Sequence, residues 1–241
     1  MKDQASSTSV RILDGERSGW TAALALASAT WIAGGASAQA PRALSLGDLA
    51  PSREVQMLSV DGNRTTIGEA AGERGTLVIF TCNHCPWAQA WESRLVTLAN
   101  AYLDRGVGAI AINSSDPSVY SRELFERMRE RATAAGFHLQ YSDESYREMR
   151  RRAIAGDYRF PYVVDATSDV ARSFGATRTP EVFLFDARSR LVYHGAVDDN
   201  PIEPDAVEEH FLRDALQALV TGRPQPRAET RSVGCAIAFR E

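Results

Sequence analysis

The stretch Thr76–Leu98, TLVIFTCNHCPWAQAWESRLVTL, decides the fold of this chain. It opens with the apolar run Leu77–Phe80, which is typical of a strand buried on both faces. From Pro86 onward, large apolar side chains recur every three or four positions, which predicts one face of a helix. Cys82 and Cys85 therefore lie between the end of a buried strand and the first turn of a helix.

The position of the two cysteines predicts their chemistry. The first turn of a helix carries unpaired backbone N–H groups and the positive end of the helix dipole, so it stabilises a thiolate relative to a thiol. We expect Cys82 to be the more acidic of the two, since cysteines of Cys-x-x-Cys motifs at helix N-termini have pKa values of roughly 3.5 to 7.5, below the ~8.5 of ordinary cysteine. Cys85, one turn further along, is placed to attack a mixed disulfide at Cys82 and release the partner.

Composition excludes several classes of function. The 241 residues allow one sizeable domain with appendages, and 44% hydrophobic with 24% charged residues is ordinary for a soluble protein. A net charge of -4 gives no reason to expect binding to nucleic acid or to an anionic membrane. The sequence has no phosphate-binding glycine loop and no nucleotide fingerprint, so no cofactor is predicted. Three cysteines are too few for a disulfide scaffold, which leaves redox or metal chemistry for the pair.

Residues 1–40 have the features of a cleavable export signal. Trp20–Ala33 is uncharged and mostly apolar, and Gly34–Ala40 contains two Ala-x-Ala sites, as in a signal-peptide cleavage region. Cleavage is expected after Ala40, with Ala38 as the second choice. The pattern predicts an exported protein of the bacterial periplasm, without membrane contact after cleavage. An uncleaved anchor is the alternative, although the many small residues weaken a stable span.

The rest of the chain predicts one domain at residues 41–222 and a C-terminal tail at 223–241. Residues 44–69 have the pattern of a short loop followed by an N-terminal β-hairpin. Val107–Asn113 is a second continuous apolar strand, and the order strand, helix, strand implies a right-handed parallel crossover. The cysteine pair then lies at the carboxyl end of the first strand, where an open α/β sheet binds its substrate.

Residues 120–158 predict an inserted pair of helices. Shifting the chain by 21 positions aligns Ser121–Tyr141 with Ser142–Tyr162, and eight of the 21 pairs are identical. We interpret this as a local duplication, with chance similarity between two arginine-rich helices as the alternative, and the run Arg150–Arg152 as a solvated helix face. The side chains expected to face inward are Phe125, Met128 and Ala132 in the first copy and Tyr146, Met149 and Ala153 in the second.

The remaining pattern completes an α/β domain. Its expected elements are a strand at Phe160–Asp165, a short helix at Ser168–Phe174, a hairpin of strands at Glu181–Asp186 and Leu191–His194, and a final helix at Val207–Val220. The last fifteen residues are expected to form a polar tail that carries Cys235.

The order of these elements resembles the thioredoxin fold, an α/β fold with a central mixed β-sheet flanked by helices. More narrowly, the chain resembles the thioredoxin-like redoxin proteins, which are grouped near the AhpC/TSA peroxiredoxins as peroxiredoxin-like. The motifs that carry the likeness are FTCNHCPW, AINSSD, FPYVVD, GATRTPEVFLFD and the late Gly-Cys of the tail, and the likeness spans residues 44–240.

The resemblance implies roles for individual residues. Cys82 would be the exposed nucleophile, Cys85 the resolving cysteine, and Pro180 the cis-proline that faces them. Thr179, just before the proline, would present its backbone groups to an extended substrate peptide. His84, when protonated, would stabilise the Cys82 thiolate and make the disulfide more oxidising.

Two further side chains are expected to shape the site, and the third cysteine has two interpretations. Asn83 and His84 stand where thioredoxin itself has Gly-Pro, and Trp87 is expected in the site wall. The sequence shows no clear equivalent of the buried acid that thioredoxin places beneath its pair, which leaves the proton-transfer partner of Cys85 unassigned. Cys235 is either a solitary or partner-linked tail cysteine, or a further resolving thiol that returns to the pair.

The favoured function is a thiol–disulfide oxidoreductase that acts on protein or small-molecule thiols and disulfides, together with a redox partner. A thiol peroxidase is one alternative, but it needs a Ser or Thr hydroxyl three residues before its cysteine, and Ile79 and Cys82 occupy those places. A copper-binding or copper-delivery module is another, with Cys82, Cys85 and one histidine as ligands of Cu(I). A purely structural disulfide is disfavoured, because closing so short a loop removes little chain entropy.

Overall fold

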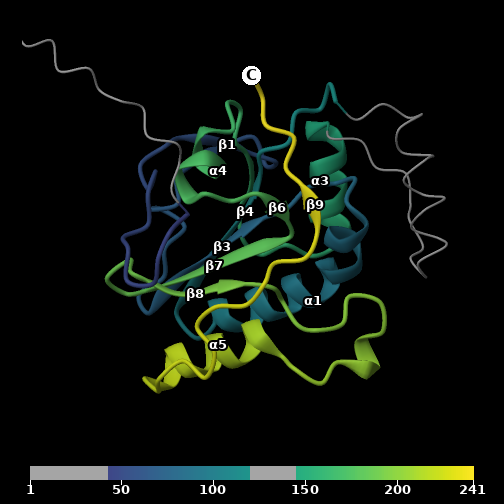
Figure 1. Cartoon of the computed structure of the whole chain (residues 1–241). Coiled ribbons are helices and arrows are strands. Elements are labelled where there is room, and N and C mark those ends of the chain that lie inside the picture. The colour runs from purple at the N-terminus through teal and green to yellow at the C-terminus, as the bar shows by residue number, and fades with distance from the viewer. Residues whose placement is uncertain (1–42, 120–144) are drawn as a thin grey trace, which may run out of the picture. The chain divides into compact units, whose positions relative to one another are not determined.

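A computed structural model describes residues 43–119 and 145–241 of the chain (Figure 1). The predicted export signal and the first copy of the duplicated helix lie outside the described residues. None of the helices in these two ranges combines the length and the apolar surface of a membrane span. The elements in chain order are β1 Met57–Ser59, β2 Arg64–Thr65, β3 Gly75–Phe80, α1 Pro86–Leu103, β4 Val107–Asn113, α3 Tyr146–Ala155, β5 Tyr162–Val164, α4 Asp169–Phe174, β6 Arg178–Thr179, β7 Glu181–Asp186, β8 Leu191–Gly195, the 3₁₀ turn η1 Pro204–Ala206, α5 Phe211–Thr221 and β9 Cys235–Ala236.

A central mixed sheet holds seven strands of the described residues in the order β2-β1-β5-β4-β3-β7-β8. β3, β4 and β5 run parallel, whereas β1 pairs antiparallel with β5, and β7 pairs antiparallel with β3. β3 lies between β4 and β7, and all six of its residues are buried, as its continuous apolar run predicts. The mixed sheet expected from the sequence is confirmed. The cysteine pair directly follows β3, which is an interior strand of this sheet.

Helices cover both faces of this sheet. Side chains alternate along β3, so Leu77 and Ile79 point to one face and Val78 and Phe80 to the other. The first face packs against α1, α3 and α5, and the second packs against α4. Each fully buried aliphatic or aromatic side chain contributes roughly 1.5–3 kcal/mol relative to its exposed state. The strand that leads into the cysteine pair is therefore held from both sides.

Helix α3 is the second copy of the predicted duplication. The Ser145 hydroxyl accepts a hydrogen bond from the backbone N–H of Glu148 at 3.2 Å, which caps the first turn. Met149 and Ala153 are buried, and Tyr146 is half-buried against the same cluster. The inward face expected for this helix is confirmed.

The last helix starts later than the sequence predicts. Helix α5 begins at Phe211 rather than Val207. The backbone N–H of Asp199 donates to the carbonyl of Glu209 at 3.2 Å, and the N–H of Glu208 donates to the Asp199 side chain at 3.2 Å. These contacts with the loop residue Asp199 hold the residues before α5 outside the helix and override their local propensity.

The C-terminal residues are packed onto the domain. Glu229 forms a bridge with His194 of β8, and β9 then pairs antiparallel with β6. Ile237 is buried, with 6% of its surface exposed, against the face that α4 covers. The expectation of a polar tail is therefore wrong, because backbone pairing and a buried aliphatic side chain anchor these residues.

Candidate functional site

The cysteine pair follows β3 and opens α1. Cys85 is the N-cap residue of α1, and Pro86 occupies the first turn, where its missing N–H costs no helical hydrogen bond. Cys82 and Cys85 are 1% and 0% exposed, and all three cysteines of the chain are thiols in this structure. The exposed Cys82 that the family resemblance implies is wrong for this structure, because the C-terminal residues pack over the pair.

Thr179 contacts both thiols. The peptide bond between Thr179 and Pro180 is cis, as the resemblance implies. The Thr179 hydroxyl lies 2.9 Å from Cys82 Sγ, and the Cys85 thiol donates to the Thr179 carbonyl at 3.0 Å. One residue of the proline loop thus positions both sulfurs, although it is distant from them in sequence.

The loop between the two cysteines is buried and braced by three neighbours. The side-chain oxygen of Asn83 accepts a hydrogen bond from the Tyr162 hydroxyl of β5 at 3.0 Å. The Asn83 carbonyl accepts from Gln89 Nε2 at 2.8 Å and from Arg152 Nη1 of α3 at 3.2 Å. The backbone between the cysteines is therefore fixed by side chains from β5, α1 and α3.

His84 and Trp87 flank the pair. His84 is buried, and its Nε2 lies 3.8 Å from Cys82 Sγ, where a protonated imidazole would stabilise a thiolate. Trp87 is half-buried against the two cysteines and Ala88. The structure places both residues at the pair, as expected from the sequence.

Arg152 is a site residue that the sequence pattern misses. Its side chain is only 10% exposed and pairs with Glu92 of α1 at 2.5 Å, so the solvated face expected for it is wrong. The Tyr158 hydroxyl donates to the same carboxylate at 3.0 Å. Burial alone lowers the pKa of Arg152, but Glu92 outweighs it and raises the pKa, which keeps the guanidinium charged beside Asn83. The sequence does contain one signal for this burial. Arg152 lies three residues after the buried Met149, and residues three apart are neighbours on a helix surface.

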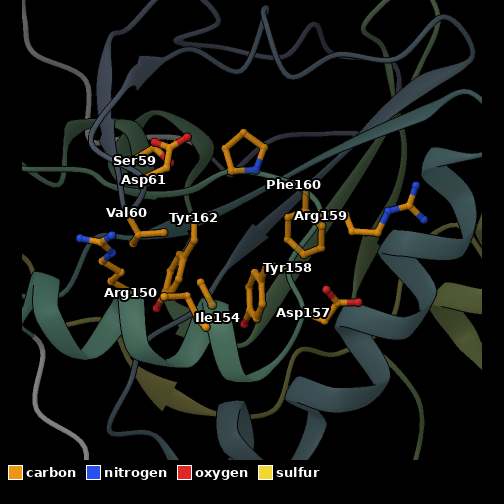
Figure 2. Close-up of a pocket in the computed structure, with 12 residues that line it drawn as sticks. Ser59, Val60, Asp61, Arg150, Ile154, Asp157, Tyr158, Arg159, Phe160 and Tyr162 are labelled. Atoms are coloured by element: carbon orange, nitrogen blue, oxygen red, sulfur yellow. The ribbon is translucent and has the colours of Figure 1, made fainter.

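A surface pocket of about 530 Å³ adjoins this bracing network (Figure 2). Tyr158 and Tyr162 line it with stacked rings whose centroids are 5.6 Å apart. Figure 2 shows these rings beside one another, with Arg150 and Arg159 on either side of them. The cysteines do not line this pocket. The pocket is connected to the cysteine loop by one of its lining residues, Tyr162, whose hydroxyl donates to the Asn83 side chain.

Cys85 carries a lowered pKa in this structure. Burial alone raises the pKa of its thiol, but hydrogen bonds with the Cys235 and Cys82 thiols and with the backbone N–H groups of Ala88 and Cys235 hold the pKa well below that of ordinary cysteine. The expectation from the sequence that Cys82 is the more acidic of the two stays a prediction. The lowered pKa of Cys85 arises from donors to its sulfur, among them the backbone N–H of Ala88 in the first turn of α1 and the groups of Cys235.

Cys235 reaches the pair from the far end of the chain. Its backbone N–H donates to Cys85 Sγ at 3.4 Å, and its side chain packs against Cys82 and Cys85. The register of β9 on β6 sets Cys235 opposite Thr179. Cys235 therefore lies next to the pair, and its role as a further resolving thiol stays a prediction.

Glu181 is a second residue that the sequence pattern misses. It is buried directly after the cis-proline, and its carboxylate accepts from the backbone N–H groups of Thr177 at 2.9 Å and Arg178 at 3.1 Å. His194 Nε2 lies 2.7 Å from the same carboxylate. Burial alone raises the pKa of Glu181, but the hydrogen bonds with His194 and the two N–H groups outweigh it and lower the pKa. The carboxylate therefore fixes the loop that presents Thr179 to the thiols.

Across 43–119 and 145–241, no three or more His, Cys, Asp and Glu side chains are grouped so as to hold a metal ion. Those ranges include the cysteine pair and His84.

Solved structures share both fold and sequence with this chain. An uncharacterized conserved protein from Geobacillus kaustophilus is 33% identical with a TM-score of 0.67, and the match covers 81% of this chain and 93% of that one. A hypothetical protein from Sinorhizobium meliloti 1021 is 29% identical with a TM-score of 0.67, over 83% of this chain and 97% of that one. A thioredoxin-like protein in its oxidized form is 15% identical with a TM-score of 0.50, over 74% and 97%, which is a likeness of fold alone.

Comparison with curated proteins gives no match. The profile of the Redoxin family matches residues 45–209, which is more than half of the chain. That range contains the cysteine pair and the cis-proline, and Cys235 lies beyond it. The chain therefore belongs to the Redoxin family, with a thioredoxin-like fold and a thiol redox function.

Proposed function

We propose that this chain is a thiol–disulfide oxidoreductase that works through Cys82 and Cys85. The observation that carries the proposal is their convergence on Thr179, whose hydroxyl lies 2.9 Å from one sulfur and whose carbonyl lies 3.0 Å from the other. Two sulfurs held by one residue are placed to alternate between a dithiol and a disulfide. Because its pKa is lowered, the Cys85 thiol that donates to the Thr179 carbonyl loses its proton more readily than an ordinary cysteine and becomes a thiolate, which is the form of cysteine that attacks disulfides.

The proposed reaction moves two electrons. Cys82 passes its proton to the Cys85 thiolate across their hydrogen bond and attacks one sulfur of a substrate disulfide. The substrate S–S bond breaks, a mixed disulfide forms on Cys82, and the departing substrate thiolate takes up the proton from Cys85. The Cys85 thiolate then attacks the Cys82 sulfur and releases the second substrate thiolate. The substrate is reduced and the pair is oxidised; the reverse sequence oxidises a substrate dithiol.

Protein or small-molecule thiols and disulfides are the substrates of this proposal. The backbone groups of Thr179 suit an extended peptide, and a separate redox partner returns the pair to its starting state. We place the reaction in an exported compartment such as the bacterial periplasm, on the strength of the signal pattern in residues 1–40.

Exchange with insulin or glutathione disulfide tests the proposal. Cys82→Ser removes the attacking sulfur, so turnover falls to background. Cys85→Ser stops at a mixed disulfide on Cys82 that mass spectrometry detects. Thr97→Ser, at an exposed position of α1, is the control and keeps wild-type turnover. Full activity in Cys82→Ser would refute the proposal.

The reduction potential of the pair determines the direction of the reaction. Equilibration with glutathione buffers, followed by trapping of the remaining thiols, measures it. A potential near about -270 mV makes the protein a reductant of exported disulfides, and one near about -120 mV makes it an oxidant of exported thiols.

A thiol peroxidase is a second candidate, favoured by one contact. The hydroxyl that the sequence spacing does not provide for Cys82 comes from Thr179, 2.9 Å from its sulfur. In that reaction the Cys82 thiolate attacks hydrogen peroxide, the O–O bond breaks, and a sulfenic acid and water form; Cys85 then displaces a second water to give the disulfide. Rapid sulfenic acid formation at Cys82 that slows in Thr179→Val would favour this candidate. Slow peroxide loss that Thr179→Val leaves unchanged would remove it.

A further inference from the structure

The C-terminal segment Thr230–Arg240 lies beside the thiols, and its residues Cys235–Ala236 form an added strand, β9. β9 pairs antiparallel with β6, which sets Cys235 opposite Thr179, and the N–H of Ile237 donates to the carbonyl of Thr177 at 2.9 Å. In Figure 1 the yellow segment passes β8 and reaches β9 beside β6. Extended peptides bind to strands in the same way, through main-chain hydrogen bonds. The chain itself therefore occupies the place that an external peptide would take at Thr179.

Gly234 makes this close approach possible. A Cβ added at Gly234 would lie 2.0 Å from the Thr179 carbonyl oxygen, a distance at which the backbone would have to move. Arg178 Nη1 donates to the Gly234 carbonyl at 3.1 Å and holds the residue in place. A side chain before the cysteine would push the strand away from β6, so Gly-Cys is the sequence that fits.

The C-terminal segment is held on both sides of Cys235. Before the cysteine, the Thr230 hydroxyl hydrogen-bonds with the Tyr193 hydroxyl at 2.8 Å. After it, Ile237 is buried in the cluster under α4. These two attachments keep Cys235 at the pair.

Cys85 lies between the other two thiols. The backbone N–H of Cys235 donates to Cys85 Sγ at 3.4 Å, and Cys85 also hydrogen-bonds with the thiols of Cys82 and Cys235. Thiol–disulfide exchange requires the attacking sulfur to lie next to the sulfur that it attacks. A disulfide to Cys85 is therefore within reach of both Cys82 and Cys235.

We propose that the C-terminal segment is an internal substrate of the dithiol, an inference that rests on the proposed oxidoreductase function. Starting from the Cys82–Cys85 disulfide, the Cys235 thiolate attacks the sulfur of Cys85. The bond between Cys82 and Cys85 breaks, a bond between Cys85 and Cys235 forms, and Cys82 leaves as a thiolate that takes up the proton given up by Cys235. No electron enters or leaves the chain, so the oxidised protein exists in two forms.

The site on β6 where the C-terminal segment pairs also defines the class of external substrate. An external peptide has to displace the C-terminal segment before it pairs with β6. The peptide that fits is an extended strand with glycine before its cysteine and an aliphatic residue two positions after it, as Gly234 and Ile237 stand around Cys235.

Disulfide mapping tests the internal exchange. Full-length Cys82→Ser protein is equilibrated with reduced and oxidised glutathione, the remaining thiols are alkylated, and the peptides are identified by mass spectrometry. We expect an internal Cys85–Cys235 disulfide as the main oxidised product. Glutathione adducts at Cys85 or Cys235 without that disulfide would overturn the inference.

A pair of matched variants tests whether the C-terminal segment has to pair with β6 for this disulfide to form. In the Cys82→Ser background, Gly234→Val should lower the yield of the Cys85–Cys235 disulfide about tenfold or more, the effect of losing about 1.4 kcal/mol of docking free energy. Ala236→Val places the same side chain at an exposed position of β9 and should leave the yield unchanged. With Cys82 present, Gly234→Val should speed exchange with a synthetic Gly-Cys-Ala-Ile peptide linked to glutathione.

The outcomes separate the two proposals. Wild-type protein that exchanges with glutathione disulfide but never forms the Cys85–Cys235 bond refutes the internal substrate and keeps the oxidoreductase. Equal disulfide yields in Gly234→Val and Ala236→Val refute the close approach at Gly234, and with it the class of external peptide derived from that approach. Absence of exchange in every form, with the fold intact by circular dichroism, refutes the oxidoreductase itself.

Discussion

The two walls that enclose the thiols are held by different forces. β3 and α1 form one wall, and their side chains, such as Phe80 and Trp91, are buried in the cores on either side of the sheet. The C-terminal segment forms the other wall, attached by backbone hydrogen bonds, by side-chain hydrogen bonds such as that between Thr230 and Tyr193, and by one well-buried aliphatic side chain, Ile237. Burial contributes roughly 1.5–3 kcal/mol per large side chain and a hydrogen bond about 1 kcal/mol net. We therefore expect the first wall to open only on global unfolding and the second to open alone.

The largest effect is expected in the first wall, at Phe80. Its ring is fully buried and packs edge-on against Phe174 and Phe183, with centroids 5.2 and 5.7 Å away. Phe80→Ala should lower the free energy of unfolding by about 3–5 kcal/mol, because the cavity adds to the lost burial. Urea unfolding measures it, with the exposed Val233→Ala as a control expected within about 0.5 kcal/mol. A loss below about 1 kcal/mol at Phe80 would mean that the core does not hold this wall.

The second effect concerns the brace between α3 and the cysteine loop. Arg152→Met leaves the carboxylate of Glu92 without its ion pair and the Asn83 carbonyl without one donor, so the free energy of unfolding should fall by about 2 kcal/mol. Arg151→Met is the matched control, since Arg151 is 57% exposed and its pair with Glu148 should contribute less than about 0.5 kcal/mol. Equal losses in the two variants would show that Arg152 lies on an ordinary solvated face.

The third effect is a pH dependence at Glu181. Its folded pKa lies below its ordinary value of 4.5, so the carboxylate contributes stability above that pH and loses it as the pH falls through the lower folded pKa. Glu181→Gln should therefore cost about 1 kcal/mol at neutral pH and progressively less toward about pH 3. Urea unfolding at both pH values checks this, with the exposed Glu229→Gln as the control. If Glu181→Gln lowers the free energy of unfolding equally at both pH values, the loss comes from the changed shape of the side chain and not from its charge.

The smallest effect on global stability is expected in the second wall. Ile237→Ala should raise the alkylation rate of Cys82 and Cys85 in native protein about threefold and lower the free energy of unfolding by only about 0.7 kcal/mol, because local opening and global unfolding lose the same contacts of the C-terminal segment. Ile154→Ala makes the same change at a residue that is 72% exposed, and both readouts should stay at wild-type values. A global loss as large as that of Phe80→Ala would show that the segment unfolds with the core.

The contrast between the two walls also explains which parts of the structure can be predicted from the sequence. β3, α1 and β4 follow from local periodicity, because every side chain that defines them has its partner in a continuous core. Thr179 and Pro180 follow from the family resemblance, and the structure places them against the thiols. Local pattern thus accounts for the central strands and for α1, and the family resemblance accounts for the proline side of the cysteine site.

The remaining site residues depend on partners that are distant in sequence. Arg152 has the composition of a solvated helix face, and only Glu92, sixty positions away, shows that it is buried. Glu181 looks like the start of a strand until the proline loop folds over it. β9 has two residues and no periodicity, so nothing in its own sequence predicts that it pairs with β6.

The pairing of β9 with β6 also affects the tendency of the protein to aggregate. Unpaired strand edges are templates on which other chains add and aggregate. While β9 is in place, the backbone groups of Arg178 and Thr179 are paired within the chain. Each opening of the C-terminal segment exposes this edge to neighbouring molecules as well as to substrate. We therefore expect the segment to protect against aggregation, so a protein truncated at Val233 should scatter more light on concentration than the full chain.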